Sequence, residues 1–182
     1  MAKPRRKPLP PATVSRAALL VDGSDAEFRG LIHDLIAYGH RLDAIRDMFA
    51  EIAGISGVQY EILMLVSRSG GLSVGEVATR LHRSGAFITI EANKLVLRGI
   101  LEKASDPGDG RKVILRTNAS SIQLLDRLAP FQRRINDMLF ERLDARRFRQ
   151  LRTLARDLVT SGDRALSMLH FMLHDAKKTD AA

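Results

Sequence analysis

The segment that most constrains the fold is a run of five turn-forming residues, Asp-Pro-Gly-Asp-Gly at positions 106–110. On either side of it, residues 100–105 and 112–116 alternate between apolar and polar side chains, with the period of two that is typical of β-strands. Asp, Pro and Gly each favour tight turns, because they adopt or stabilise the backbone angles that a turn needs. The pattern predicts a β-hairpin with basic residues along one face.

Two short helices are predicted immediately before this hairpin. Ser73 and Glu76 have the spacing of a capping box, which predicts a helix over about 74–81. Ser84 is a second N-cap candidate, and the helix that it begins runs through Arg98. Two short helices joined by a tight turn are typical of a helix-turn-helix, and a hairpin directly after it is typical of a wing.

The rest of the chain is predicted to be helical. Apolar residues three and four apart predict a long helix from an N-cap at Ser24 to Gly54, and a second helix over about 56–67. Two further apolar stripes cover the last third of the chain. A helix as long as the first one needs a partner along its length, and a second subunit is a reasonable partner. We therefore expect a mainly α fold with a small β-hairpin wing, a winged helix-turn-helix with long N- and C-terminal dimerisation helices.

The positive charge of the chain is concentrated at its start. The sequence has 29 Lys and Arg residues against 21 Asp and Glu, a net charge of +8, and five of the basic residues precede the first acidic one. Four of the six prolines also lie in this stretch, which predicts a mobile arm. Such an arm either enters a DNA minor groove or only keeps the chain soluble, and both interpretations stay open. The remaining excess of charge is weak evidence for nucleic-acid binding.

Several classes of function are not expected. The chain has no cysteine, which excludes disulfides, thiolate metal sites and thiol nucleophiles. Phosphate-binding loops, zinc-protease motifs and hydrolase motifs are missing from the sequence. We expect no enzyme activity, no catalytic residues, no cofactor and no metal. Without a secretory signal or a long apolar run, a cytoplasmic location is expected.

The helix-turn-helix and hairpin segment, residues 72–117, resembles the MarR family of winged-helix transcriptional regulators. The matching pieces are residues 72–81, 94–103 and 106–115, and the most specific match is Asp106-Pro107 followed by Asp109 and Arg111 at the tip of the wing. The resemblance covers about residues 25–172. Lys103 stands where the family usually has Arg, and Phe87 and Ile90 stand at positions that are often small or polar.

The resemblance implies a homodimer that binds a pseudo-palindromic, double-stranded DNA operator. It also implies a repressor that is relieved by a small aromatic or acyl ligand. The predicted organisation is a flexible, basic, proline-rich arm over 1–22, an N-terminal dimerisation helix over 23–54, a winged helix-turn-helix DNA-binding region over 55–117, C-terminal dimerisation helices over 118–175 and a tail over 176–182. The alternative is a winged-helix dimer that binds small molecules or proteins without specific contacts to DNA bases.

The predicted DNA-contacting residues lie on the second short helix and at the wing tip. They are Ser84, Gly85, Phe87, Thr89, Ile90, Asn93, Lys94, Asp109, Arg111 and Lys112. Helix N-termini attract phosphate, which favours Ser84 and Gly85 as backbone anchors. Phe87 and Ile90 either contact thymine methyl groups or pack sideways on neighbouring helices, and both remain open. The planar guanidinium of Arg111 suits a narrow minor groove.

Candidate ligand-binding residues lie on the first two predicted helices. In the family that the chain resembles, ligands bind between these helices and the helix after the wing. The candidates are Tyr38, His40, Arg46, Tyr60 and Met64. A Tyr or Met on an apolar stripe also has the simpler interpretation of a core residue, and spacing alone does not show that the five converge.

Overall fold

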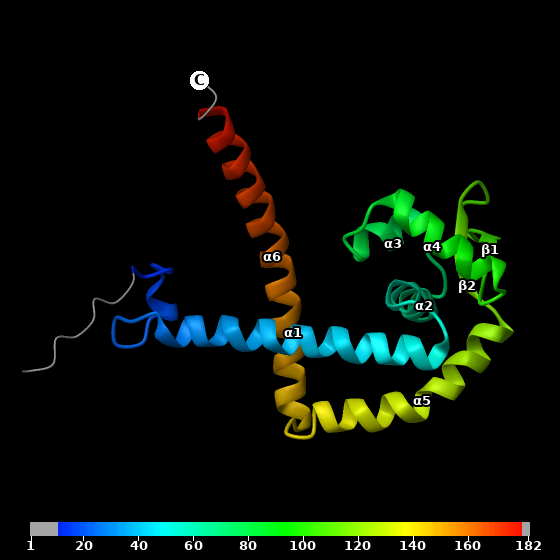
Figure 1. Ribbon diagram of the computed structural model, residues 1–182, viewed down its shortest axis with the longest axis horizontal. Coiled ribbons are helices and arrows are strands. Elements are labelled where there is room, and N and C mark those ends of the chain that lie inside the picture. The colour runs from blue at the N-terminus through cyan, green and yellow to red at the C-terminus, as the bar shows by residue number, and fades with distance from the viewer. Residues whose placement is uncertain (1–10, 180–182) are drawn as a thin grey trace, which may run out of the picture. The chain divides into compact units, whose positions relative to one another are not determined.

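The computed structural model describes residues 11–179, so that residues 1–10 of the predicted basic arm and residues 180–182 lie outside the described part. The elements follow one another in the order η1 (Ala17–Leu19, a 3-10 helix), α1 (Ala26–Ala53), α2 (Gly57–Ser69), α3 (Val74–Arg80), α4 (Gly85–Leu97), β1 (Leu101–Ser105), β2 (Val113–Thr117), α5 (Ala119–Leu139) and α6 (Ala145–Thr179) (Figure 1). The predicted mainly α fold with one β-hairpin is confirmed.

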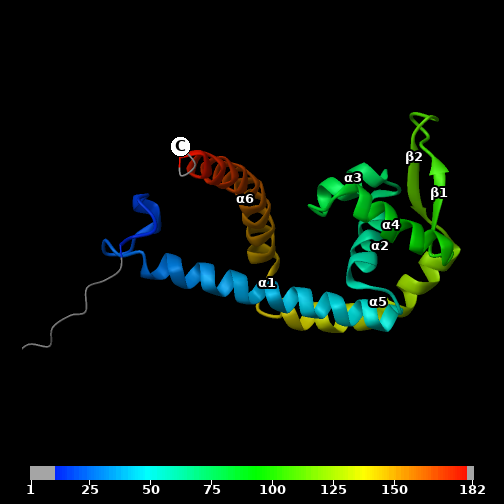
Figure 2. The same cartoon turned by 45° about the horizontal axis from the view of Figure 1, so that its top comes forward.

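The chain forms two compact units, with the boundary after Gln132, inside α5. The first unit contains the hairpin, in which β1 and β2 pair antiparallel from Leu101 opposite Thr117 to Ser105 opposite Val113. Figure 2 shows this hairpin projecting beyond α2, α3 and α4, with the turn at its free end. The core beneath it is aliphatic. Its fully buried side chains include Ile62, Leu63, Val66, Val77, Ile88, Leu95, Leu101, Leu115 and Leu128.

The loop before α3 holds the base of the hairpin. Leu72 and Leu115 exchange two backbone hydrogen bonds, of 3.1 and 2.7 Å between N and O. Gly71 precedes this bridge with a φ of +144°, and a Cβ there would lie 2.9 Å from Ile114 Cδ1 and 3.2 Å from Arg116 Cγ. The backbone angle thus favours glycine at position 71, and the side chains of Ile114 and Arg116 would have to shift to admit a Cβ.

We expect Gly71→Ala to lower the free energy of unfolding by about 1–3 kcal/mol, since alanine would be strained at this φ and would crowd the strand. Urea unfolding followed by circular dichroism measures the change. Gly75→Ala is the matched control, because Gly75 lies in α3 and a Cβ added there would meet nothing within 4 Å. That variant should be neutral or more stable by up to about 1 kcal/mol. Equal effects at both glycines would contradict the packing role of Gly71.

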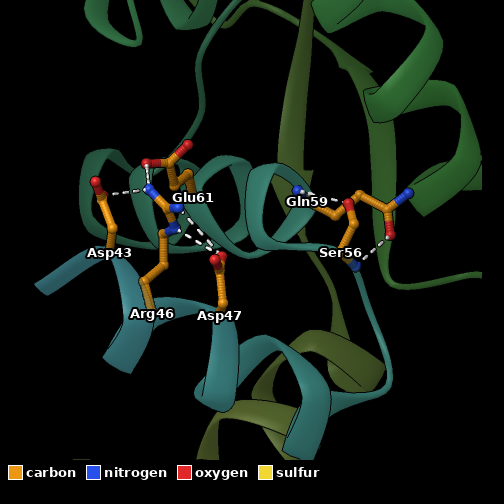
Figure 3. Close-up of polar contacts among 6 residues, drawn as sticks. All are labelled: Asp43, Arg46, Asp47, Ser56, Gln59 and Glu61. Carbon is orange, nitrogen blue, oxygen red and sulfur yellow. Dashed lines mark hydrogen bonds and ion pairs between the residues drawn. The ribbon is translucent and has the colours of Figure 1, made fainter. Parts of the chain in front are cut away.

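A charged cluster links α1 to α2. Arg46 Nη1 donates to Asp43 Oδ1 at 2.8 Å and to Glu61 Oε1 at 2.9 Å, and Nη2 donates to Asp47 Oδ1 at 3.1 Å (Figure 3). A Cβ at Gly57 would lie 2.2 Å from Asp47 Oδ1, so the glycine lets this cluster approach the start of α2. Burial alone would lower the pKa of Arg46, but the hydrogen bond to Asp47 and the charge of Glu61 outweigh it and raise that pKa.

The described part of the predicted arm differs from an extended chain. Residues 17–19 form η1, and the Thr13 backbone N–H and hydroxyl both donate to Asp25 Oδ2, at 2.7 and 2.8 Å. Asp25 is buried and also accepts from Arg29 at 2.5 Å. The N-cap of α1 is Asp25 rather than the predicted Ser24, although the Asp25 side chain makes no cap hydrogen bond. The carboxylate binds Thr13 of the preceding segment instead. These two residues are twelve positions apart, and the periodicity of the sequence does not predict that they pair.

We expect Asp25→Ala to free residues 13–24 from α1 and to speed hydrogen exchange of the Thr13 amide. The hydrogen bonds from Thr13 and the charge of Arg29 hold the pKa of Asp25 below its usual value. The ionised Asp25 carboxylate therefore stabilises the folded state fully above the pKa of about 3.9 that an aspartate has in the unfolded chain. This stabilisation is lost as pH falls through the lower pKa of Asp25 in the folded protein. Asp34→Ala, which removes an exposed carboxylate of α1, is the control. Slow Thr13 exchange in the Asp25 variant would contradict this role.

The second unit contains the end of α5 and the 35-residue helix α6. The helix continues to Thr179, so that residues 176–179 of the predicted tail are helical. It is amphipathic, and its apolar side chains are exposed in this single chain. They include Phe148, Leu151, Leu154, Leu158, Leu166, Leu169, Met172 and Leu173. An apolar stripe of this length on one helix is typical of a surface that is covered by a partner.

Within residues 11–179, no single helix combines the length and hydropathy that a membrane span needs, and α1 and α2 meet that requirement only when joined across a bend of 87°.

Candidate nucleic-acid interface

In the helix-turn-helix, a serine side chain caps the start of each of the two helices. Ser73 Oγ accepts from the Glu76 backbone N–H at 3.2 Å while Glu76 Oε2 accepts from the Ser73 N–H at 2.8 Å, which confirms the predicted capping box. Ser84 Oγ accepts from the Phe87 N–H at 3.3 Å and begins α4, also as predicted. Between the helices, His82 adopts a positive φ of 50°, which makes the turn tight. The N-terminal end of α4 is therefore exposed, and Ser84 caps it.

A buried polar pair fixes the inner face of α4. Gln59 closes the capping box of α2 with Ser56 through its Oε1 (Figure 3), and its Nε2 donates to Glu91 Oε2 at 2.8 Å. Lys94 Nζ donates to the other oxygen, Oε1, at 2.6 Å. These two hydrogen bonds, that of Lys94 first, outweigh burial and hold the pKa of Glu91 below its usual value. The carboxylate is thus charged and satisfied, and its hydrogen bond from Gln59 joins α4 to α2.

The far end of α4 is held by the start of α5. Asn118 Nδ2 donates to the Gly99 carbonyl at 3.0 Å, and the Ser121 hydroxyl donates to the Ile100 carbonyl. Asn118 Oδ1 in turn accepts from the Ser121 N–H at 3.0 Å. Asn118, Ser121 and Gln59 were not predicted from the sequence, because their partners lie 19 to 32 residues away along the chain. The available signal in the sequence was Asn118 three residues before Ser121, a spacing that is typical of the capped start of a helix.

The outer face of α4 carries apolar side chains. Phe87 is 40% exposed and Ile90 is 56% exposed, whereas Ile88, Ala92 and Leu95 on the opposite face are buried. The structure therefore leaves Ile90 facing outward rather than packed sideways on a neighbouring helix, and Phe87 lies at the margin. The other predicted contact residues of the helix, Ser84, Gly85, Thr89 and Lys94, are exposed, and Asn93 is half-buried.

The wing tip is an ordered turn that presents an arginine. Asp106 Oδ1 accepts from the Gly108 N–H at 2.7 Å and from the Asp109 N–H at 3.3 Å. Asp109 Oδ1 accepts from the Arg111 N–H at 3.2 Å and lies 3.6 Å from Arg111 Nε. The Arg111 side chain is nevertheless 97% exposed. Asp109 and Arg111 are thus brought together as predicted, and the exposed neighbour Lys112 adds a second positive charge at this end of the hairpin.

The predicted ligand-binding residues do not form one cluster. The Tyr60 hydroxyl accepts from Gln132 Nε2 at 2.6 Å, and the same nitrogen lies 3.8 Å from Met64 Sδ. Phe49 adds a ring contact to Tyr60, with centroids 6.1 Å apart. Burial raises the pKa of Tyr60, against the opposite effect of the Gln132 hydrogen bond. Gln132, which was not predicted from the sequence, therefore joins α5 to this part of α2.

Three of the predicted ligand-binding residues lie apart from Tyr60 and Met64. Arg46 belongs to the charged cluster between α1 and α2. Tyr38 is half-buried, and burial raises its pKa, while His40 is exposed. Within the described range, no hydrogen bond joins Tyr38 or His40 to the pair around Gln132.

The chain is similar in sequence to bacterial transcriptional regulators. The model of the MarR family matches residues 53–112, from the end of α1 to the wing. The repressor NicR of Pseudomonas putida is 27% identical over 111 residues, which are 61% of this chain and 70% of NicR. The regulator YhbI of Bacillus subtilis is 24% identical over 114 residues, which are 63% of this chain and 74% of YhbI.

Solved structures show the same fold. CouR from Rhodococcus jostii, bound to p-coumaroyl-CoA, matches with a TM-score of 0.61 at 18% identity, over 68% of this chain and 87% of CouR. A mutant MarR from E. coli complexed with operator DNA matches with a TM-score of 0.58 at 16% identity, over 72% of this chain and 95% of that MarR. At these identities the likeness is one of fold, and it confirms the winged helix-turn-helix.

Proposed function

We propose that this chain, which belongs to the MarR family of winged-helix transcriptional regulators, acts as a homodimer that binds a pseudo-palindromic operator and represses transcription until a small ligand releases it. The observation that carries the DNA contact is the wing tip, where Arg111 is almost fully exposed and positioned by Asp109 at the end of a hairpin that follows a capped helix-turn-helix. In this proposal, α4 enters the major groove and Arg111 enters the flanking minor groove. Lys112 neutralises a phosphate.

The start of α4 supplies the phosphate anchor in this proposal. Ser84 and Gly85 are exposed at this end of the helix, and the helix dipole favours an anion there. The hydrogen bond from Gln59 to Glu91 joins the middle of α4 to α2 and so helps to position the helix. Fixed donors give a phosphate contact that positions the helix before any base is contacted.

The proposed dimer explains the apolar faces that a single chain leaves uncovered. Leu31, Leu35 and Ile36 of α1 are exposed, as is the apolar stripe of α6. A second copy would bury the same surfaces on both chains, as two-fold symmetry requires. The symmetry would also set two half-sites one helical turn apart, roughly 10 base pairs centre to centre.

The proposed ligand response rests on the contacts around Tyr60. The candidates at this place are Tyr60 and Met64, with Gln132 added by the structure. The other candidates predicted from the sequence, Tyr38, His40 and Arg46, lie apart from them. CouR, which shares the fold, is bound to p-coumaroyl-CoA, and this supports an aromatic or acyl effector. A ligand that displaces the Gln132 side chain from Tyr60 would change the link between α5 and α2. Such a ligand would release DNA only if it bound the conformation that does not bind DNA more tightly than the conformation that does.

Selection of bound duplexes from a random pool, at near-physiological salt, tests the proposed function. Recovery of an inverted repeat with the predicted half-site spacing is the expected result. Recovery of no motif would overturn sequence-specific regulation and favour the alternative, a winged-helix dimer without specific base contacts. We place the protein in the cytoplasm with its DNA target and assign it no catalytic role.

A further inference from the structure

Building on the proposed function, we infer that α4 distinguishes its operator mainly through thymine methyl groups, with Ile90 as the central contact and Phe87 beside it. Such a contact has three requirements. The outward face of α4 must be apolar, the hydrogen-bonding groups of the helix must be engaged elsewhere, and its surroundings must suit a polyanion.

The first requirement concerns the outward side chains. Ile90 is 56% exposed and Phe87 is 40% exposed, and residues three apart lie on the same face of a helix. Three residues advance a helix by about 4.5 Å, close to the spacing of one to two base pairs. The two side chains can therefore contact neighbouring bases at the same time.

The second requirement concerns the polar groups of α4. The Thr89 hydroxyl donates to the Gly85 carbonyl at 2.8 Å, which engages its proton within the helix and leaves its oxygen as an acceptor. Glu91 is buried and accepts from both Gln59 and Lys94. Lys94 is thereby paired with Glu91, although its side chain stays 54% exposed.

The remaining candidates for hydrogen bonds to bases are few. Ser84 Oγ accepts from the Phe87 N–H, which holds this side chain at the cap and leaves its hydroxyl proton for the phosphate at the helix start. Asn93 and Lys94 are the two side chains of α4 whose types form paired hydrogen bonds to adenine or guanine, but Asn93 is half-buried and Lys94 donates to Glu91. An apolar contact is then the main means by which α4 can distinguish bases.

The third requirement decides the partner. The only acidic residue of α4 is the buried Glu91, while Arg83, Lys94 and Arg98 are exposed at or near the helix. An apolar patch that is flanked by cations and lies beside a helix N-terminus suits a polyanion that carries methyl groups. In the major groove of DNA, the C5-methyl group of thymine is the apolar group that marks a base pair.

The test replaces single thymines of the selected duplex with uracil, which removes only the methyl group. Burial of one methyl group corresponds to about a fourfold change in affinity. We expect the wild-type protein to bind about fourfold more weakly at one or more substituted positions in each half-site. Ile90→Ala should bind the unmodified duplex more weakly and should lose this discrimination. Fluorescence anisotropy at fixed salt measures both affinities.

Leu97→Ala is the matched control. Leu97 is also on α4 and is 87% exposed, but it lies at the C-terminal end, away from the end that enters the groove. This variant should keep the thymine preference of the wild type. Thermal unfolding checks that both variants fold. We expect that they do, because both substituted residues are exposed. The uracil series on the wild-type protein needs no variant at all.

The outcomes separate the thymine contact from the proposed function. A wild-type protein that binds an inverted repeat specifically but tolerates uracil at every position would overturn the thymine contact and leave the regulator intact. The same conclusion follows if Ile90→Ala keeps the full preference for thymine. If selection recovers no motif, the proposed function fails, and the base contact fails with it.

Discussion

Replacing Arg111 by alanine is expected to weaken operator binding on the order of 100-fold, with both wings of a dimer contributing about tenfold each. The side chain is 97% exposed and touches the protein only near Asp109, so the substitution removes a DNA contact and little else. The free energy of unfolding should change by less than about 0.5 kcal/mol. Fluorescence anisotropy with the selected duplex measures the affinity.

Two controls make this prediction specific. Arg111→Lys keeps the charge but loses the planar guanidinium, and it should recover only part of the affinity. Arg146→Ala removes one exposed arginine from α6, outside the winged helix-turn-helix, and should change the affinity little. If the Arg146 variant binds as weakly as the Arg111 variant, the effect is one of net charge, and the wing has no special role.

The second large effect is expected from the apolar stripe of α6. Leu151→Asp combined with Leu158→Asp places four carboxylates in the proposed dimer interface, two from each chain. Each buried leucine contributes about 1.5–3 kcal/mol, and a buried carboxylate adds a further penalty, so the dimer dissociation constant should rise by at least about 1000-fold. Sedimentation equilibrium measures this constant, and operator affinity should fall with it because a monomer binds one half-site.

The matched control uses the same helix and the same change in charge. Thr153→Asp combined with Thr160→Asp has the same spacing of seven residues on a polar part of α6. Both threonines are exposed, and their hydroxyls donate to carbonyls of the preceding turn. This variant should remain dimeric. A monomer from the threonine pair, or a dimer from the leucine pair, would contradict the proposed interface.

The sequence predicted the elements whose causes are local. The capping box at Ser73 and Glu76 and the N-cap at Ser84 form because the partners are three residues apart. The wing follows from a turn that Asp106 stabilises by its own side chain. The bounds of α3, α4 and the hairpin therefore agree closely with the pattern.

Distant pairings were not predictable in this way. Thr13 binds Asp25 across twelve residues, Gln59 binds Glu91 across 32, and Gln132 binds Tyr60 across 72. No period or spacing indicates such contacts, because they depend on how whole elements pack. The roles of the predicted DNA-contacting and ligand-binding residues remain predictions, although the structure has removed one ambiguity by leaving Ile90 exposed.

The most direct test of the central claim compares the affinity for the selected duplex with that for a scrambled duplex of the same composition, over a range of salt concentrations. A sequence-specific regulator should bind the selected duplex on the order of 1000-fold more tightly at near-physiological salt. Equal affinities that fall together steeply as salt rises would show binding by charge alone, and would contradict specific regulation by this chain.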